Sequence, residues 1–96
     1  MAVYVILDNE VHDPESYAAY LEATPAFVKK HGGEYLVRGG DFEVIIGDWA
    51  PKRLVVFRYP NRQAVSDMMN DPDYQPLKKI RETATTTHNL MIIDGI

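Results

Sequence analysis

An unbroken apolar run near the start of the chain constrains the fold more than any other feature. The segment Ala2–Glu10 is rich in Val, Ile, Tyr and Leu and is bounded by acidic residues. A strand places successive side chains on opposite faces, so Val3, Val5 and Leu7 share one face and the apolar residues between them share the other. The run therefore predicts a strand that is buried on both sides.

Two later segments repeat this apolar pattern on both faces. The runs Leu54–Tyr59 and Leu90–Ile93 are mostly apolar on both faces. An antiparallel sheet commonly packs one face on the core and leaves the other in water, so an apolar second face needs its own cover. A second copy of the chain provides that cover through a self-complementary, two-fold interface. We therefore expect a homodimer formed through the helix-free face of the sheet.

Cap residues and prolines mark the first helix. Asp13 supplies an N-cap and Pro14 a proline at the first helical position, and the apolar spacing continues to the end of the segment. Gly32 follows as a residue that closes helices in the left-handed conformation. Pro25 lies inside this stretch, so the helix is either kinked there or restarts with Thr24 as a second N-cap.

Two more helices are predicted in the second half of the chain. Asn61 caps a short helix that ends near Asn70, and Asp71–Asp73 repeats the combination of cap and proline. This N-cap at Asp71 opens a last helix that continues to about Thr85. Pro76 leaves two possible starts for this helix, because the regular helix can begin either after Asp71 or only at Pro76.

The remaining extended segments complete a familiar order. They are Glu34–Arg38, Phe42–Asp48, Arg53–Tyr59 and His88–Asp94. A glycine pair at residues 39 and 40 predicts a hairpin or a bent strand between the first two segments. Strands and helices then follow the split βαβ order of an α+β ferredoxin-like sandwich, in which helices cover one face of an antiparallel sheet. Residues 1–96 are expected to form one such domain.

Composition and charge exclude several classes of function. The chain has no cysteine, which excludes a disulfide framework and a thiolate nucleophile. Its net charge of −4 lacks the basic footprint of nucleic-acid binders. No run approaches the length of a membrane span, and the first ten residues lack the pattern of a secretory signal. We therefore expect a cytoplasmic domain with neither nucleic acid nor membrane among its partners.

Residues spread over nearly the whole chain resemble one known family. The matching positions are Tyr17, Tyr20, His31–Gly33, Leu36–Gly40, Gly47, Trp49, Arg53, Tyr59, Pro60, Ala64, Asp71–Tyr74, Arg81, Asp94 and Gly95. With these residues the chain resembles domain-of-unknown-function family 1330, in the dimeric α/β-barrel superfamily. The resemblance implies the ferredoxin-like fold and the dimer. Two segments depart from the family, which usually has Glu-Phe-Pro-Ser in place of Arg58–Asn61 and an aromatic pair in place of Met68 and Met69.

The resemblance leaves the activity open. The family has no agreed activity, and its superfamily includes monooxygenases without cofactors, isomerases, haem-degrading enzymes and peroxidases. We expect a domain that binds a small anionic or aromatic molecule in a cleft between sheet and helices, with no cofactor, either as a binding protein or as a metal-free enzyme. The alternatives are a non-catalytic interaction or stress-associated module and an enzyme similar to the cofactor-free monooxygenases.

Three side chains are the first candidates for binding such a ligand. Tyr74 and Arg81 lie seven residues apart on one face of the last helix, so both lean toward the sheet. Arg38 precedes two glycines, which let a ligand approach its guanidinium closely. Core packing of Tyr74, a backbone contact of Arg81 and an ion pair between Arg38 and Glu43 are the simpler alternatives. In a binding cleft, the two guanidiniums predict a ligand that carries a carboxylate or a similar anion.

Four further residues have weaker signals. Tyr17 shares the apolar stripe of the first helix, and Trp49 follows an extended segment where it could gate a pocket, although both also suit a core or an interface. Arg58 lies inside a strand between aromatic residues, which predicts an ion pair across the dimer interface. His88 opens the last strand and is a weak candidate for an acid or base. The three histidines lack the spacing of metal ligands, so no metal site is predicted.

Overall fold

Strand β1 (Val3–Val11) lies in the interior of a four-stranded sheet in the computed structural model, which describes residues 1–96. It pairs antiparallel with β3 (Leu54–Tyr59) on one side and with β4 (Thr85–Asp94) on the other. Strand β2 (Glu34–Arg38) completes the sheet beside β3. The strand order β2-β3-β1-β4 is that of a ferredoxin-like antiparallel sheet, which confirms the predicted α+β fold.

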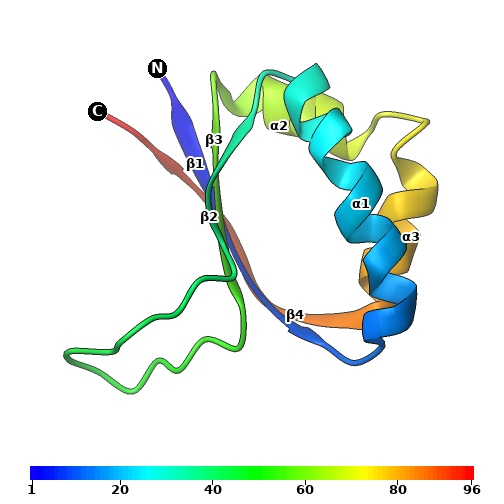
Figure 1. Cartoon of the computed structure of the whole chain (residues 1–96). Helices are drawn as coiled ribbons and strands as arrows, with labels where there is room; N and C mark the ends of the chain where they lie inside the picture. The colour runs from blue at the N-terminus through cyan, green and yellow to red at the C-terminus, as the bar shows by residue number, and fades with distance from the viewer.

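All three helices cover the same face of this sheet (Figure 1). They are α1 (Pro14–Lys30), α2 (Arg62–Met69) and α3 (Gln75–Ala84). The core between helices and sheet consists of Val3, Val5, Tyr17, Tyr20, Val28, Tyr59, Val65, Met68, Tyr74 and Ala84. The two termini lie near each other at one end of the sheet, because β1 and β4 are neighbours (Figure 1). None of the helices has the length and apolar character needed to cross a membrane.

Helix α1 begins and ends at the residues that the sequence indicates. The Asp13 carboxylate accepts a hydrogen bond of 3.1 Å from the Ser16 backbone N–H, and Gly32 follows the helix with a φ of +78°. Pro25 lies within one continuous helix. Of the two alternatives, the restart at Thr24 is therefore wrong, and the buried Thr24 side chain belongs to the face of α1 that packs on the core.

The predicted N-cap at Asp71 is also wrong. Helix α3 begins only at Gln75, and no side chain caps it. One Asp71 oxygen accepts from the Asp73 backbone N–H (2.9 Å), which closes a short turn before the helix. The other oxygen binds Lys30 Nζ (2.7 Å) and His31 Nε2 (2.8 Å) at the end of α1. Asp71 thus joins α1 to the connection between α2 and α3 instead of starting a helix.

The segment Phe42–Asp48, which the sequence predicts to be extended, forms no strand. It lies in a loop between β2 and β3 that projects from the sheet on the side away from the helices (Figure 1). The segment pairs with no strand of the sheet. Its apolar side chains are exposed, up to 92% for Ile46. The last strand is longer than the predicted His88–Asp94. Strand β4 begins three residues earlier, at Thr85, because its first residues pair with the end of β1 beyond a bulge.

The helix-free face of the sheet is apolar along its central strands. Tyr4 and Ile6 of β1 pair with Ile93 and Met91 of β4, and Ile6 also pairs with Val56 of β3. Ile93 and Met91 are 51% and 50% exposed. The two-faced apolar pattern of the strands therefore produces one buried face and one face that exposes apolar side chains to solvent.

Candidate functional site

A small cavity lies between the sheet and the helices, and Tyr74 and Arg81 both line it. Its walls come from β1, α1, β3, α2, α3 and β4, and they are Val5, Leu7, Tyr20, Phe57, Tyr59, Val65, Met68, Met69, Tyr74, Arg81 and Leu90. We call this space the inner cavity. It leaves about 30 Å³ for water-sized molecules, which is room for one or two waters. Arg81 is the only charged residue among the walls.

Two phenols meet in the inner cavity. The hydroxyl groups of Tyr20 on α1 and Tyr74 before α3 lie 3.1 Å apart, and both side chains are buried. Burial raises the pKa of the Tyr20 phenol well above its ordinary value, and the neighbouring Tyr74 adds to this effect. Burial also raises the pKa of Tyr74. Both phenols are therefore neutral at pH 7, and each can donate a hydrogen bond.

The Arg81 side chain has no acidic partner in the chain. Arg81 is 8% exposed, its Nε lacks a hydrogen-bond partner, and no carboxylate lies within 4.0 Å of its guanidinium. Buried arginines are normally paired, because an isolated charge is costly to remove from water. The inner cavity thus holds a buried guanidinium without an acidic partner beside two neutral phenols.

Arg38 lies in a second space that adjoins the first, which we call the outer cavity. Its walls are Leu7, Tyr17, Tyr20, Leu21, Tyr35, Arg38, Arg53, Val55 and Phe57. Arg38 donates a hydrogen bond of 3.0 Å from Nη2 to the Leu21 carbonyl oxygen, and its Cζ lies 4.5 Å from the centre of the Tyr35 ring. It forms no ion pair with Glu43, so that alternative is wrong. The structure thus places Arg38 next to the cavity of Tyr74 and Arg81 and not in it.

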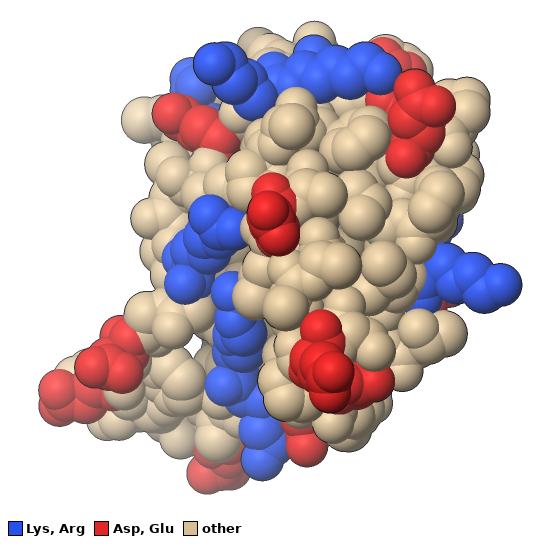
Figure 2. Space-filling view, turned by 45° about the vertical axis from the view of Figure 1, so that its right-hand side comes forward, with Lys and Arg blue, Asp and Glu red and all other residues tan.

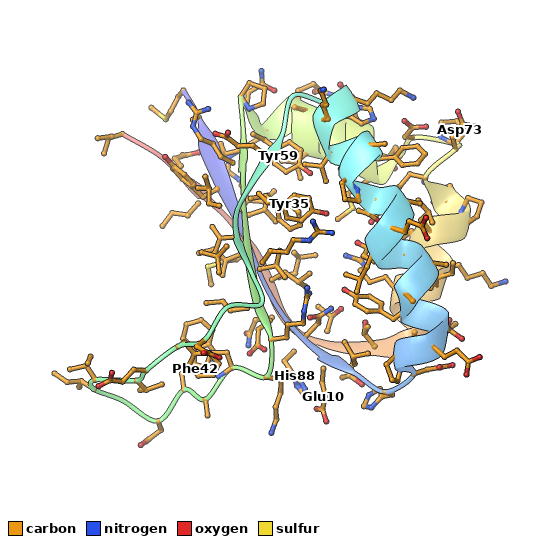
Figure 3. All side chains as sticks on the ribbon, in the orientation of Figure 1. Glu10, Tyr35, Phe42, Tyr59, Asp73 and His88 are labelled. Carbon is orange, nitrogen blue, oxygen red and sulfur yellow. The ribbon has the colours of Figure 1, made fainter.

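Tyrosines from three elements lie in the space between the layers. Tyr35 of β2 and Tyr59 of β3 point from the sheet toward α1 (Figure 3). Burial raises the pKa of Tyr35 to about 12. Tyr17 of α1 stacks on Tyr20 with ring centres 5.1 Å apart, and its hydroxyl accepts from Asn9 Nδ2 at 3.3 Å. The predicted candidate Tyr17 therefore lies in the wall of the outer cavity.

The other candidates lie away from both cavities. Trp49 is in the projecting loop, where its Nε1 donates to Asp8 on the helix-free side of the sheet at 3.1 Å. His88 Nε2 lies 2.9 Å from a Glu10 oxygen at the end of the sheet, and both side chains are 40% exposed (Figure 3). The structure contains no group of three His, Cys, Asp or Glu side chains placed to hold a metal ion.

Arg58 lies on the helix-free face, where an acid of the same chain is near it. Its Nη1 is 3.6 Å from Glu34 Oε1 on the neighbouring strand β2. This contact provides the acid that a cation within a strand requires. An ion pair between Arg58 and a second chain stays a prediction.

Sequence reasoning missed two residues of the cleft, Arg53 and Tyr35, and assigned Tyr20 to the core or a cleft edge. Arg53 is two residues before Val55, so strand alternation places both on the helix-covered side of β3. Tyr35 of β2 pairs with Phe57 of β3, so it lies on the same helix-covered side of the sheet. The period of two in these strands was the available signal, but only the register shows which strands lie side by side.

The fold and the cleft define a class of small ferredoxin-like domains with a partly open space between an antiparallel sheet and its helices. The profile of the family described as "Domain of unknown function (DUF1330)" matches residues 2–96. The chain belongs to this family, as its residue pattern indicates. No curated protein matches the sequence.

Solved structures of low sequence identity share the fold. A protein of unknown function from Rhodopseudomonas palustris is 20% identical with a TM-score of 0.79, and the match covers 99% of this chain and 82% of that one. SnoaB, a cofactor-independent oxygenase from Streptomyces nogalater, is 13% identical with a TM-score of 0.66 over 99% and 93% of the two chains. A Mycobacterium tuberculosis protein is 20% identical with a TM-score of 0.62 over 100% and 96%.

Proposed function

We propose that this protein is a dimeric domain that binds a small organic acid in the cleft between its sheet and its helices. The observation that carries this proposal is the buried Arg81 guanidinium, which has no carboxylate partner and one unsatisfied nitrogen. A carboxylate ligand would supply the missing charge and accept two parallel hydrogen bonds. The neutral phenols of Tyr20 and Tyr74 would donate to the same anion.

The rest of the inner cavity favours an apolar body on this ligand. Ten of its eleven wall residues are hydrophobic. The free space holds only a water or two, so a ligand must displace side chains that occupy the cleft. Met68 and Met69 on α2 are suited to this, because methionine has three rotatable bonds and readily repacks. The proposal therefore includes a cleft that opens through these two side chains.

The test compares carboxylates with their neutral amides. We expect benzoate, phenylacetate and hexanoate to raise the melting temperature, while benzamide, phenylacetamide and hexanamide do not. Arg81→Met keeps most of the packing volume and removes the charge, so it should weaken carboxylate binding at least about tenfold, or roughly 1.4 kcal/mol. Arg62→Met is the matched control, because Arg62 lies on the exposed side of α2 and pairs with Asp94.

A second variant keeps the test decisive if Arg81→Met does not fold. Met69→Trp fills the cavity from a partly exposed position, so it should abolish binding while the protein remains folded. Unchanged carboxylate affinity in both variants, or no binding of any carboxylate to the unmodified protein, would show that Arg81 belongs to the scaffold.

The dimer is the second part of the proposal. The exposed apolar residues on the helix-free face, among them Met91 and Ile93, support a second copy of the same face as their cover. This arrangement leaves the helix-covered cleft of each chain accessible. The expected assembly is therefore a homodimer with one cleft in each protomer.

A cofactor-independent oxygenase is the second candidate function. The fold similarity to SnoaB and the guanidinium beside the phenols of the inner cavity favour it, because such a site can hold an oxygen-reactive phenolate. Oxygen consumption with electron-rich phenols would distinguish catalysis from binding. Oxygen consumption by the unmodified protein that is lost in Arg81→Met would support an enzyme. Carboxylate binding without oxygen consumption would support a binding domain.

A further inference from the structure

Two further guanidiniums lie on the same face of the sheet as the cleft. Arg38 at the end of β2 pairs with Val55 of β3, and Arg53 lies just before β3 and two residues before Val55, so the two arginines are diagonal neighbours. Both line the outer cavity. Each also lies over a tyrosine ring, with Arg38 Cζ 4.5 Å from the centre of Tyr35 and Arg53 Cζ 5.9 Å from that of Tyr17.

Neither of these guanidiniums has an acidic partner. No carboxylate lies within 4.0 Å of either one, although the chain has 14 acidic residues and a net charge of −4. Asp8 of β1, which pairs with the first residue of β3, already accepts hydrogen bonds from Trp49 Nε1 and the Lys52 backbone N–H. Figure 2 shows Lys and Arg side chains gathered in a line that runs down to the base of the projecting loop. Like charges on neighbouring strands repel unless an anion lies between them.

A glycine makes room for one of the two cations. A Cβ atom on Gly39 would lie 2.8 Å from Arg53 Nε and 3.3 Å from its Cζ, so a side chain at this position would displace the guanidinium from its present place. Gly39 has a φ of +70° and donates its N–H to the Leu54 carbonyl oxygen at 2.9 Å. The close approach holds Arg53 beside the end of β2, where Arg38 is the last residue.

The outer and inner cavities adjoin each other and share part of their walls. Leu7, Tyr20 and Phe57 line both. The buried Arg81 lines the inner cavity, whereas the exposed Arg38 and the half-buried Arg53 line the outer one. One cation therefore lines the inner cavity and two line the outer cavity, with shared apolar and aromatic residues between them.

We propose that the outer cavity is a second anion subsite and that the natural ligand is a dicarboxylate. This inference rests on the proposed function, because one carboxylate binds Arg81 as described above. The other carboxylate lies between Arg38 and Arg53, and the apolar chain of the ligand lies against Tyr20 and Phe57. The Tyr35 phenol, with its pKa raised by burial, is a neutral donor beside the outer pair.

Titration calorimetry with paired probes of equal chain length tests the second subsite. The probes are adipate, pimelate and suberate against hexanoate, heptanoate and octanoate, at constant ionic strength. At least one dicarboxylate should bind about tenfold more tightly than its monocarboxylate partner. Arg38→Met and Arg53→Met should each remove most of this advantage and leave monocarboxylate affinity within about twofold, whereas Arg81→Met weakens both classes of ligand. Arg62→Met again serves as the control for loss of one surface charge.

A pair of glycine variants tests the position of Arg53 separately. Gly39→Ala places a methyl group against Arg53 and should reduce dicarboxylate affinity selectively. Gly47→Ala is its control, since Gly47 also has a positive φ (+108°) but nothing within 4 Å of the added atom.

The outcomes separate the two proposals. Monocarboxylates that bind through Arg81 without any gain from a second carboxylate would overturn the dicarboxylate and leave the proposed function intact. A gain that survives both Arg38→Met and Arg53→Met would also overturn the outer subsite. The absence of binding by either class of probe would overturn both proposals.

Discussion

At the Asp71 carboxylate, one buried side chain connects two parts of the helical layer. Hydrogen bonds from Lys30 and His31 at the end of α1 and from the Asp73 backbone N–H hold the pKa of Asp71 far below its ordinary value. A carboxyl group with a lowered pKa in the folded state stabilises that state above its unfolded pKa of about 3.9. The contribution disappears as pH falls through the lower, folded pKa.

We therefore expect Asp71→Asn to lower the melting temperature at pH 7, because it removes the charge that binds Lys30 and His31. The difference between the unmodified protein and the variant should be constant above about pH 5 and should shrink steadily below about pH 4. Melting curves across this range measure it. Asp73→Asn is the control, since it keeps the backbone N–H that binds Asp71. A difference that does not change with pH would contradict the ionic role of Asp71.

The projecting loop between β2 and β3 is held at its return to the sheet by Asp8. The two Asp8 oxygens accept hydrogen bonds from Trp49 Nε1 (3.1 Å) and from the Lys52 backbone N–H (2.9 Å). Burial opposes ionisation of this carboxyl group, but the two donors keep its pKa below the ordinary value. Trp49 is the only tryptophan in the chain, so its fluorescence reports on this anchor without background.

We expect Asp8→Ala to release the loop while the sheet remains folded. Trp49 should then show lower fluorescence anisotropy and emission shifted further to the red, because its 52% exposed side chain loses its only hydrogen bond. Asp8→Asn keeps one acceptor oxygen and should restore part of the anisotropy. Identical spectra for the Ala variant and the unmodified protein would mean that packing, and not Asp8, holds the loop.

At the scale of the whole molecule, the exposed apolar residues of the helix-free face predict the homodimer. Light scattering behind a sizing column should give twice the chain mass of 10.9 kDa at micromolar concentration. Ile93→Lys places a charge among the exposed apolar residues of this face and should yield monomers, because burying that charge in an apolar interface is costly.

A loop variant distinguishes the sheet from the other exposed apolar surface. Ile46→Lys changes a residue that is 92% exposed in the projecting loop and should leave the dimer intact. Dissociation by Ile46→Lys and not by Ile93→Lys would place the interface on the loop instead of the sheet. A monomeric mass for the unmodified protein would contradict the dimer itself.

Features that depend on neighbouring residues could be predicted from the sequence. The N-caps at Asp13 and Asn61 appear as expected, since a cap bonds a backbone group within the next three residues. The shared face of Tyr74 and Arg81 likewise follows from helical spacing, and both residues do line one cavity. The unbroken apolar runs in the strands were enough to indicate the sheet and its two apolar faces.

Features that depend on residues far apart in the chain could not be predicted from the sequence. Asp71 has the local pattern of an N-cap, yet Lys30 and His31, 41 and 40 residues away, and a turn determine its contacts. Phe42–Asp48 has the composition of a strand, but a strand needs a neighbour, and the sheet supplies none at this position. Register likewise determines that Arg53 lies next to Arg38 and that Arg38 is separated from Arg81 by the walls of an adjoining cavity.

The sequence by itself thus determined the elements, the ferredoxin-like order and the apolar character of both sheet faces, because helix caps and side-chain periodicity act over a few residues. Only the tertiary structure decided which charged groups have partners. The pairing of Asp71 with α1 and the lack of any acid near Arg38, Arg53 and Arg81 arise from segments far apart in the chain. Charge interactions depend on distance in space, so the candidate site became visible only after the chain was folded.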